Sequence, residues 1–314
     1  MNEATFSFCH MAMSSRRMTA ILVSKRMAIS MPKADGPRLE RSCGPLRGDY
    51  IRFAPGAPGL ERFEARFAGH AYDPHRHDSY AIGYTLSGVQ SFDYRGAPRD
   101  SLPGDTMIIH PDERHDGRAG SEAGFRYRMV YVEPSIIMAA LGESARVLPF
   151  SRNAVQRDDE LIALLRMVLD DLEAEVDELQ ASCFLAGLAD LLAARDPAAA
   201  LRRPQALAKE AIRRVGRFLD ECGASPVRSS DLEAGLDRFS LAREFRTVLG
   251  TSPYRYLVMR RLDTVRRLIR SGAGLADAAA EAGFADQSHM TRHFKQAYGL
   301  SPGLWRSLMR AQPS

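Results

Sequence analysis

The sequence predicts a multi-domain α+β protein in which an antiparallel β-barrel precedes an all-α C-terminal domain. Short β-like runs separated by turn residues fill residues 50–134, and helical periodicity dominates from about residue 158. A helical unit near the C-terminus also occurs twice, with its copies 49 positions apart. With 314 residues, 45% of them hydrophobic, the chain can build two cores.

Residues 1–49 contain six methionines and no clean amphipathic period. We expect this segment to be disordered or to reflect a misassigned start codon. The pair Arg16-Arg17 resembles part of an export signal, but Lys25 and Arg26 interrupt the apolar stretch that follows. No run reaches the length of a membrane span, and four scattered cysteines are typical of a reducing cytoplasm. We therefore expect a cytoplasmic protein without a membrane anchor.

Residues 50–135 have the pattern of a small barrel or jelly roll. The clearest β-like runs are Tyr80–Leu86, Ser91–Tyr94, Thr106–His110 and Phe125–Val132. Such a barrel encloses a pocket lined by alternate side chains of its strands. We expect a small-molecule effector to contact His75, His77, Tyr84, Phe92, Tyr94 and His115, with Tyr127 and Tyr131 as further candidates. The alternative for each of these side chains is that it only fills the core of the barrel, as aromatic residues in small barrels usually do.

Two motifs in this region resemble those of the cupins. They are Gly69-(x5)-His75-x-His77-(x3)-Ala81-(x6)-Gly88, and Pro103-Gly104-Asp105 followed by Pro111–His115. The resemblance implies a cupin-like barrel, in which metal-dependent members use a Glu where this chain has Ala81. The second motif is also one residue short.

Three imidazoles, from His75, His77 and His115, still suit a transition metal. Because the carboxylate is missing, we favour a cluster that hydrogen-bonds a ligand or its own members, with no metal, no cofactor and no catalysis. A metal-dependent cupin enzyme is the alternative.

Residues 136–200 are expected to form a helical packing or dimerisation segment and a linker. Leucine and valine recur at helical spacing between Asp158 and Arg195, opposite a face rich in Asp and Glu. These helices can pack onto the barrel or against a second copy, so the sequence leaves a homodimer open. The run Asp196–Pro204 then breaks the helix.

Residues 205–310 form a basic helical domain. Lys and Arg outnumber Asp and Glu by 18 to 11 in residues 205–314, whereas residues 50–204 carry 17 and 24. We therefore expect the C-terminal part, and not the whole chain, to be attracted to the phosphates of a nucleic acid. The spacing predicts seven helices, at Ala206–Glu221, near Ser229 and Ser230, at Asp237–Leu249, Pro253–Ser271, Leu275–Ala282 and Asp286–Tyr298, and from Pro302.

The duplicated unit presents an arginine twice in the same way. Its copies are Leu241-x-Arg243-x-Phe245-(x4)-Gly250-x-Ser252-Pro253 and Met290-x-Arg292-x-Phe294-(x4)-Gly299-x-Ser301-Pro302. In each copy a helix places two apolar residues inside and the Arg outside, Gly ends the helix, and Ser-Pro opens the next. Two exposed Arg on one basic domain predict two DNA-binding units that contact one duplex, and we call these units the first and the second head.

The stretch Gly283–Lys295, followed by Gly299 and Ser301-Pro302, resembles the AraC/XylS family of transcriptional regulators. The resemblance covers about residues 205–310. It implies a double helix-turn-helix domain whose recognition helices enter successive major grooves, about 34 Å apart, and a cupin-type sensor before it. It also implies promoter DNA, a small-molecule effector and RNA polymerase as partners of a transcriptional activator. A constitutive DNA binder whose barrel only dimerises is the alternative.

DNA contacts are predicted from one face of each recognition helix. The candidates are Arg238, Phe239, Ala242, Arg243 and Arg246 in the first head, and Gln287, Ser288, His289 and Arg292 in the second. Gln suits adenine and Arg suits guanine, because each can form paired hydrogen bonds with that base. Leu241 follows Gly235 by six positions, whereas Met290 follows Gly283 by seven. We therefore expect the first recognition helix to sit at a different angle.

Overall fold

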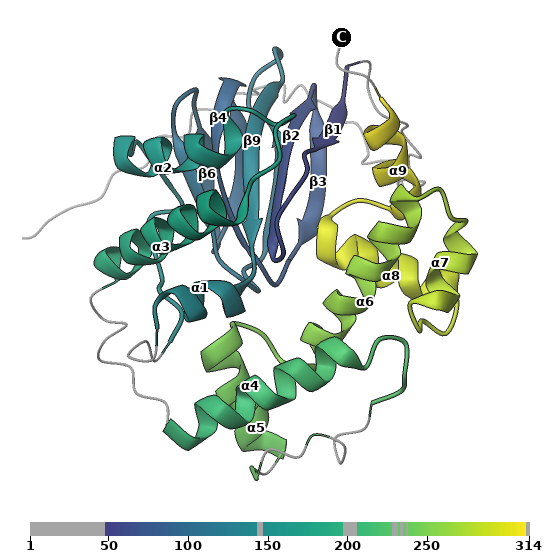
Figure 1. Ribbon diagram of the computed structural model, residues 1–314. Coiled ribbons are helices and arrows are strands. Elements are labelled where there is room, and N and C mark those ends of the chain that lie inside the picture. Colours follow the sequence, from purple (N-terminus) through teal and green to yellow (C-terminus); the bar gives the residue numbers. More distant parts are fainter. Residues whose placement is uncertain are drawn as a thin grey trace, which may run out of the picture. The chain divides into compact units, whose positions relative to one another are not determined.

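The computed structural model describes residues 48–142, 147–196, 206–227, 232, 235–236 and 238–311. All of them belong to one compact unit, Cys43–Ser314 (Figure 1). Most of the N-terminal segment, most of the predicted linker, and Ser229 and Ser230 with their short predicted helix lie outside the described residues.

The first half of the described chain is an antiparallel β-structure of two sheets, as predicted. One sheet has the order β1-β2-β9-β4-β7-β10 and the other β3-β8-β5-β6. The strands are β1 Tyr50–Phe53, β2 Leu60–Phe67, β3 His70–His75, β4 Tyr80–Gly88, β5 Gln90–Tyr94, β6 Ala97–Ser101, β7 Thr106–Ile109, β8 His115–Ala119, β9 Phe125–Val132 and β10 Val155–Gln156. Strand β10 pairs with β7, so the larger sheet includes residues that follow the predicted range 50–135.

Three helices follow β9 and cover one face of the larger sheet (Figure 1). They are α1 Pro134–Ala140, α2 Asp159–Leu169 and α3 Glu178–Arg195. The Asp158 and Asp177 side chains accept hydrogen bonds from the first turns of α2 and α3. Leu165 and Phe184 are fully buried in one cluster with Ile82 and Val130 of the sheet. The apolar stripes therefore pack within the chain, one of the two arrangements left open by the sequence.

The C-terminal part is helical and follows the predicted spacing closely. Its described helices are α4 Ala206–Glu221, α5 Arg238–Leu249, α6 Pro253–Arg270, α7 Leu275–Glu281, α8 Gln287–Tyr298 and α9 Pro302–Arg310. None of the described helices is long and apolar enough to cross a membrane.

The two copies of the repeated unit have the same local structure. Gly250 ends α5 with φ +76° and Gly299 ends α8 with φ +69°, a region that favours glycine. Ser252 and Ser301 then accept hydrogen bonds of 3.3 Å from the first turns of α6 and α9. Local sequence signals therefore specify this turn in both heads.

The two heads belong to different hydrophobic clusters. In the first head, Phe245 of α5 packs with Ile212 of α4. In the second head, Phe294 of α8 and Trp305 of α9 belong to a cluster that also contains the inner face of the barrel. The ring centroids of Trp305 and Phe53 of β1 are 5.7 Å apart. The second head thus shares a continuous core with the barrel.

Candidate ligand site and DNA interface

The structure brings the three predicted histidines together inside the barrel. His75 ends β3 and pairs with His115, which begins β8, and His77 lies two residues after His75. The His115 ring centroid is 4.1 Å from that of His75 and 4.8 Å from that of His77. All three side chains are buried. The site is therefore formed where two strands of the smaller sheet meet.

A backbone carbonyl orients each of the three rings. The Nδ1 atoms of His75, His77 and His115 lie 2.8, 2.8 and 3.0 Å from the carbonyl oxygens of Asp73, Ser79 and Glu113. A carbonyl oxygen only accepts, so each Nδ1 carries the proton and donates. Each Nε2 is then left with an unprotonated lone pair.

Burial keeps these rings neutral. It lowers the pKa values of His75 and His77 well below the usual value, and nearby imidazoles lower both pKa values further. Burial lowers the pKa of His115 to about 4. The cluster therefore presents three uncharged imidazoles near neutral pH.

Aromatic side chains surround the cluster. Phe92, Tyr94 and Tyr127 belong to the same interior, and the Tyr131 ring is 5.0 Å from the His77 ring. Ala81 pairs with Tyr131 across the sheet, so a methyl group occupies the position where the cupin pattern has Glu. Among the described residues, the histidine cluster contains no carboxylate.

The prediction that Tyr84 lines this interior is wrong. Tyr84 lies on the other face of β4, in the cluster formed with α2 and α3, and its hydroxyl donates to Asp170 at 3.4 Å. Alternation along β4 places Ala81 inside, so Tyr84, three residues later, points to the helix-covered face.

Tyr72 contributes to the site although the sequence analysis did not select it. Its hydroxyl is 2.7 Å from that of Tyr127, and its ring is 5.7 Å from that of His75. Register shifts on both sides of Tyr72 break the strict alternation of β3. A period-two pattern anchored on His75 therefore cannot identify it.

The second recognition helix, α8, exposes most of its predicted DNA-binding residues. Gln287, Ser288 and Arg292 are exposed. His289 is half-buried, and its Nε2 lies 3.0 Å from the Nε2 of His293. Phe284, Met290 and Phe294, expected to face inward, are buried. Three of the four candidates are thus accessible to a base edge.

The first recognition helix, α5, also presents its candidates outward. Ala242, Arg243 and Arg246 are exposed and line an open hollow with Thr247 and Ser252. Phe239 is 66% exposed. Arg238 begins α5, but its side chain lies outside the described part of the structure.

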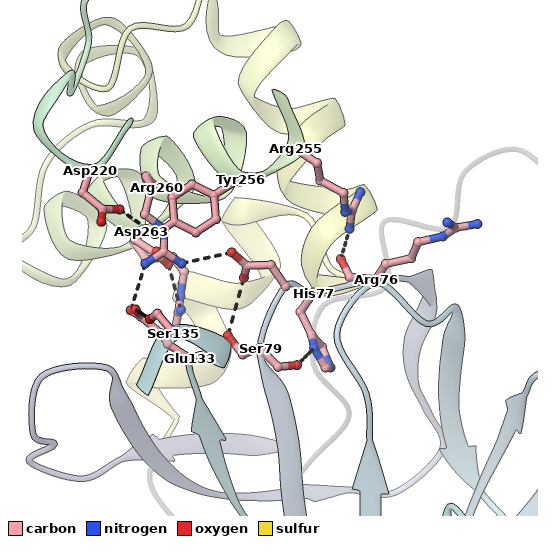
Figure 2. A network of polar contacts seen from close by, with 12 residues as sticks. Arg76, His77, Ser79, Glu133, Ser135, Asp220, Arg255, Tyr256, Arg260 and Asp263 are labelled. Atoms are coloured by element: carbon pink, nitrogen blue, oxygen red, sulfur yellow. Dashed lines mark hydrogen bonds and ion pairs between the residues drawn. The ribbon is translucent and has the colours of Figure 1, made fainter. Parts of the chain in front are cut away.

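Helix α6 carries several guanidinium groups that pair with carboxylates of the β-domain. Arg260 donates to Glu133 at 2.8 Å and to Asp78 at 3.0 Å. The Nε atom of Arg255 lies 2.9 Å from Asp112, to which the predicted DNA-binding residue Arg246 also extends, at 3.8 Å. Figure 2 shows Arg260 directed at Glu133 and Arg255 at the carbonyl of Arg76.

Strand β3 and helix α8 are also joined directly. The backbone N–H of Asp73 donates to the carbonyl of Gly299 at 2.9 Å, and that of Arg76 donates to the carbonyl of Gln296 at 3.0 Å. The Lys295 ammonium lies 3.4 Å from the Asp73 carboxylate. The strand that carries His75 therefore holds the C-terminal end of the second recognition helix.

Comparison with protein families identifies both halves of the chain. Residues 57–189 match an AraC-like ligand binding domain, and residues 232–307 match a helix-turn-helix domain. One relative, an uncharacterized HTH-type transcriptional regulator, YbfI, from Bacillus subtilis, is 29% identical over 240 residues, which are 74% of this chain and 87% of YbfI. The transcriptional activator NphR from Rhodococcus is 29% identical over 157 residues, which are 46% of this chain and 45% of NphR.

Among solved structures, ToxT from Vibrio cholerae has a similar fold. The TM-score is 0.60 at 12% identity, over 81% of this chain and 100% of ToxT. A second ToxT structure, with a TM-score of 0.57 at 11% identity over 85% of this chain and 96% of ToxT, contains an unsaturated fatty acid.

Proposed function

Because this chain belongs to the AraC-type transcriptional regulators, we propose that it binds promoter DNA sequence-specifically under the control of a small molecule held in its barrel. The observation that carries this proposal is the pair of backbone hydrogen bonds that join Asp73 of β3 and Arg76, on either side of His75, to Gly299 and Gln296 at the end of α8. A ligand that shifts β3 also shifts the helix predicted to read DNA. The two sites are thereby linked through one strand.

The DNA side of the proposal rests on the repeated exposed arginine. Arg243 and Arg292 occupy equivalent positions on two helices, each followed by the same glycine and Ser-Pro turn. A guanidinium that forms paired hydrogen bonds to guanine contributes about 1–3 kcal/mol of discrimination between bases. Two heads that bind together on successive grooves combine their contributions.

The ligand side rests on the lined interior of the barrel. The proposed effector binds at His75, His77 and His115, and Phe92, Tyr94, Tyr72, Tyr127 and Tyr131 line the interior around them. ToxT, which shares the fold, holds a fatty acid in one structure. A ligand-binding role for this domain in the present chain is consistent with that precedent.

The test is DNA affinity measured with single and double arginine variants. We expect Arg243→Ala and Arg292→Ala each to weaken operator binding by about 10-fold to 100-fold, and the double variant to lose both contributions. The exposed barrel residue Arg99 gives a charge-matched control, and Arg99→Ala should bind as the wild type does. Operator affinity unchanged in a folded double variant would contradict the proposal.

We further propose that the promoter-bound protein acts as a dimer and contacts RNA polymerase. Leu179 of α3 is 74% exposed and Met167 of α2 is 42% exposed, and the Gln180 side chain donates to the Met167 carbonyl. Two large apolar side chains on adjacent helices suit a second copy of the chain. Sedimentation of wild type and a Leu179→Glu variant measures the dimer, and transcription in vitro measures the effect on polymerase.

A further inference from the structure

The histidine cluster has an unusual arrangement of hydrogen-bonding atoms. One ring nitrogen from each of His75, His77 and His115 lies within 4.8 Å of one from each of the others. Because all three Nδ1 atoms donate to carbonyls, the nitrogens left for the centre are the Nε2 atoms, and each is an acceptor. The His77 Nε2 is buried without a hydrogen-bond partner among the described residues. Three acceptors therefore share one buried space.

This geometry disfavours hydrogen bonds among the three histidines, one of the two arrangements that the sequence analysis favoured. For one ring to donate to another through Nε2, its Nδ1 would have to give up its proton and lose the carbonyl bond, or the ring would have to become charged. All three side chains are buried, and the cluster contains no carboxylate among the described residues, so a charged ring would have no counter-ion there. A buried acceptor that has lost its water and found no donor is unfavourable. The space between the three Nε2 atoms therefore suits a cation or a hydrogen-bond donor.

We propose that His75, His77 and His115 bind one divalent transition-metal ion through their Nε2 atoms, and that this ion is the effector of the regulator. The proposal rests on the proposed function and names the chemical class of its ligand. Neutral imidazoles whose second nitrogen donates to a carbonyl are the usual form of metal-binding histidines. A set of three imidazoles without a carboxylate favours Zn²⁺, Ni²⁺, Co²⁺ or Cu²⁺ over Mg²⁺ or Ca²⁺.

The position of the ligands explains how the ion acts on DNA binding. Metal–nitrogen distances of about 2.0–2.1 Å bring ring nitrogens closer together than 4.8 Å. Binding therefore moves these side chains, which lie at the end of β3, two residues beyond it and at the start of β8. Asp73 of β3 and Arg76, the residue after His75, hold Gly299 and Gln296 of the second head through their backbone N–H groups. Metal binding thus changes the position of α8.

Metal binding is tested on the full-length protein after treatment with a chelator. Titration with Co²⁺ followed by visible absorption, and with Zn²⁺ and Ni²⁺ by calorimetry, should show one equivalent bound and the absorption bands of a nitrogen-ligated Co²⁺ ion. The variants His77→Gln and His115→Gln should lose this binding by at least 10-fold to 100-fold while circular dichroism shows that each is folded. Failure of the folded wild type to bind any of these ions would overturn the proposal.

Two control variants separate this site from surface binding. His70 is exposed and pairs with Asp73 at 3.0 Å, and His293 lies beside His289 on α8. His70→Gln and His293→Gln should each retain the full equivalent of metal. Loss of the bound metal in either control, with retention in His77→Gln, would place the ion elsewhere and contradict the assignment.

DNA affinity with and without one equivalent of metal distinguishes this inference from the proposed function. We expect the metal to change operator affinity by about 5-fold to 150-fold in the wild type and not in His115→Gln. Stoichiometric binding with no change in operator affinity would overturn the role as effector and leave the DNA-binding proposal standing. If the protein binds metal but no promoter DNA, the proposed function fails instead.

Discussion

Replacement of Arg260 by methionine should destabilise the protein by about 4 kcal/mol. Arg260 of α6 pairs with Asp78 at 3.0 Å and Glu133 at 2.8 Å, and its guanidinium carbon lies 5.1 Å from the centre of the Tyr256 ring (Figure 2). Removing one partner of a buried pair costs about 3–5 kcal/mol, because the other charge stays buried without compensation. The Asp78 side chain is only 4% exposed, so this cost applies to it. Glu133 is 31% exposed, and its pair adds at most about 1 kcal/mol.

The assay is urea unfolding followed by the fluorescence of Trp305, the single tryptophan. A double-mutant cycle with Asp78→Asn isolates the pair, and we expect a coupling free energy of about 2 kcal/mol. Arg267 lies on the same helix but is exposed, so Arg267→Met should change stability by less than about 0.5 kcal/mol. A loss below about 1 kcal/mol for Arg260→Met, or a coupling near zero, would refute this account of how α6 is held against the β-domain.

Two further predictions concern single positions. Gly299→Ala should lower the free energy of unfolding, measured by chemical denaturation, by at least about 1–2 kcal/mol, because φ is +69° and a Cβ would lie 2.6 Å from the Asp73 carbonyl oxygen. The control Gly303→Ala in α9 places a Cβ where no atom lies within 4 Å, so it should be neutral or stabilising. Equal effects of the two substitutions would contradict this prediction. Burial lowers the pKa of His110 from 6.5 to about 4, so this residue takes up a proton at a higher pH in the unfolded chain than in the folded one. The neutral buried ring therefore contributes its full share of the unfolding free energy above pH 6.5, and this share is lost as the pH falls toward 4. The variant His110→Gln keeps an acceptor for the Ser151 N–H. In denaturation curves it should reduce the difference in unfolding free energy between pH 7 and pH 5 by about 2 kcal/mol. A pH profile identical to that of the wild type would refute this prediction.

Most helices could be predicted because their ends are marked by neighbouring residues. Helix α4 spans Ala206–Glu221 as predicted, and α6 differs from its predicted range by one residue. Ser-Pro before a helix and glycine after it act through the first and last turns alone. The same local signals placed Arg243 and Arg292 outward and Phe245 and Phe294 inward. Their predicted contacts with DNA bases stay a prediction.

The ligand site was only partly predictable, because strand positions depend on register. The resemblance to the two cupin motifs predicted that His75, His77 and His115 lie together, and the structure places them within one cluster. Tyr84 was assigned to the wrong face of β4, and Tyr72 was missed because the irregular register of β3 breaks its alternation. The orientation of the three imidazoles depends on backbone carbonyls, whose directions no residue pattern encodes.

The sequence by itself determined the order of the β and helical parts, the duplicated helical unit and its outward arginines, because periodicity and capping act over a few residues. The tertiary structure alone decided which groups meet over long separations. Arg260 and Asp78 are 182 positions apart, and the hydrogen bond from Asp73 to Gly299 joins the strand of the histidine cluster to the second recognition helix. Such pairings depend on how complete elements pack, since burial and register are properties of the assembled fold.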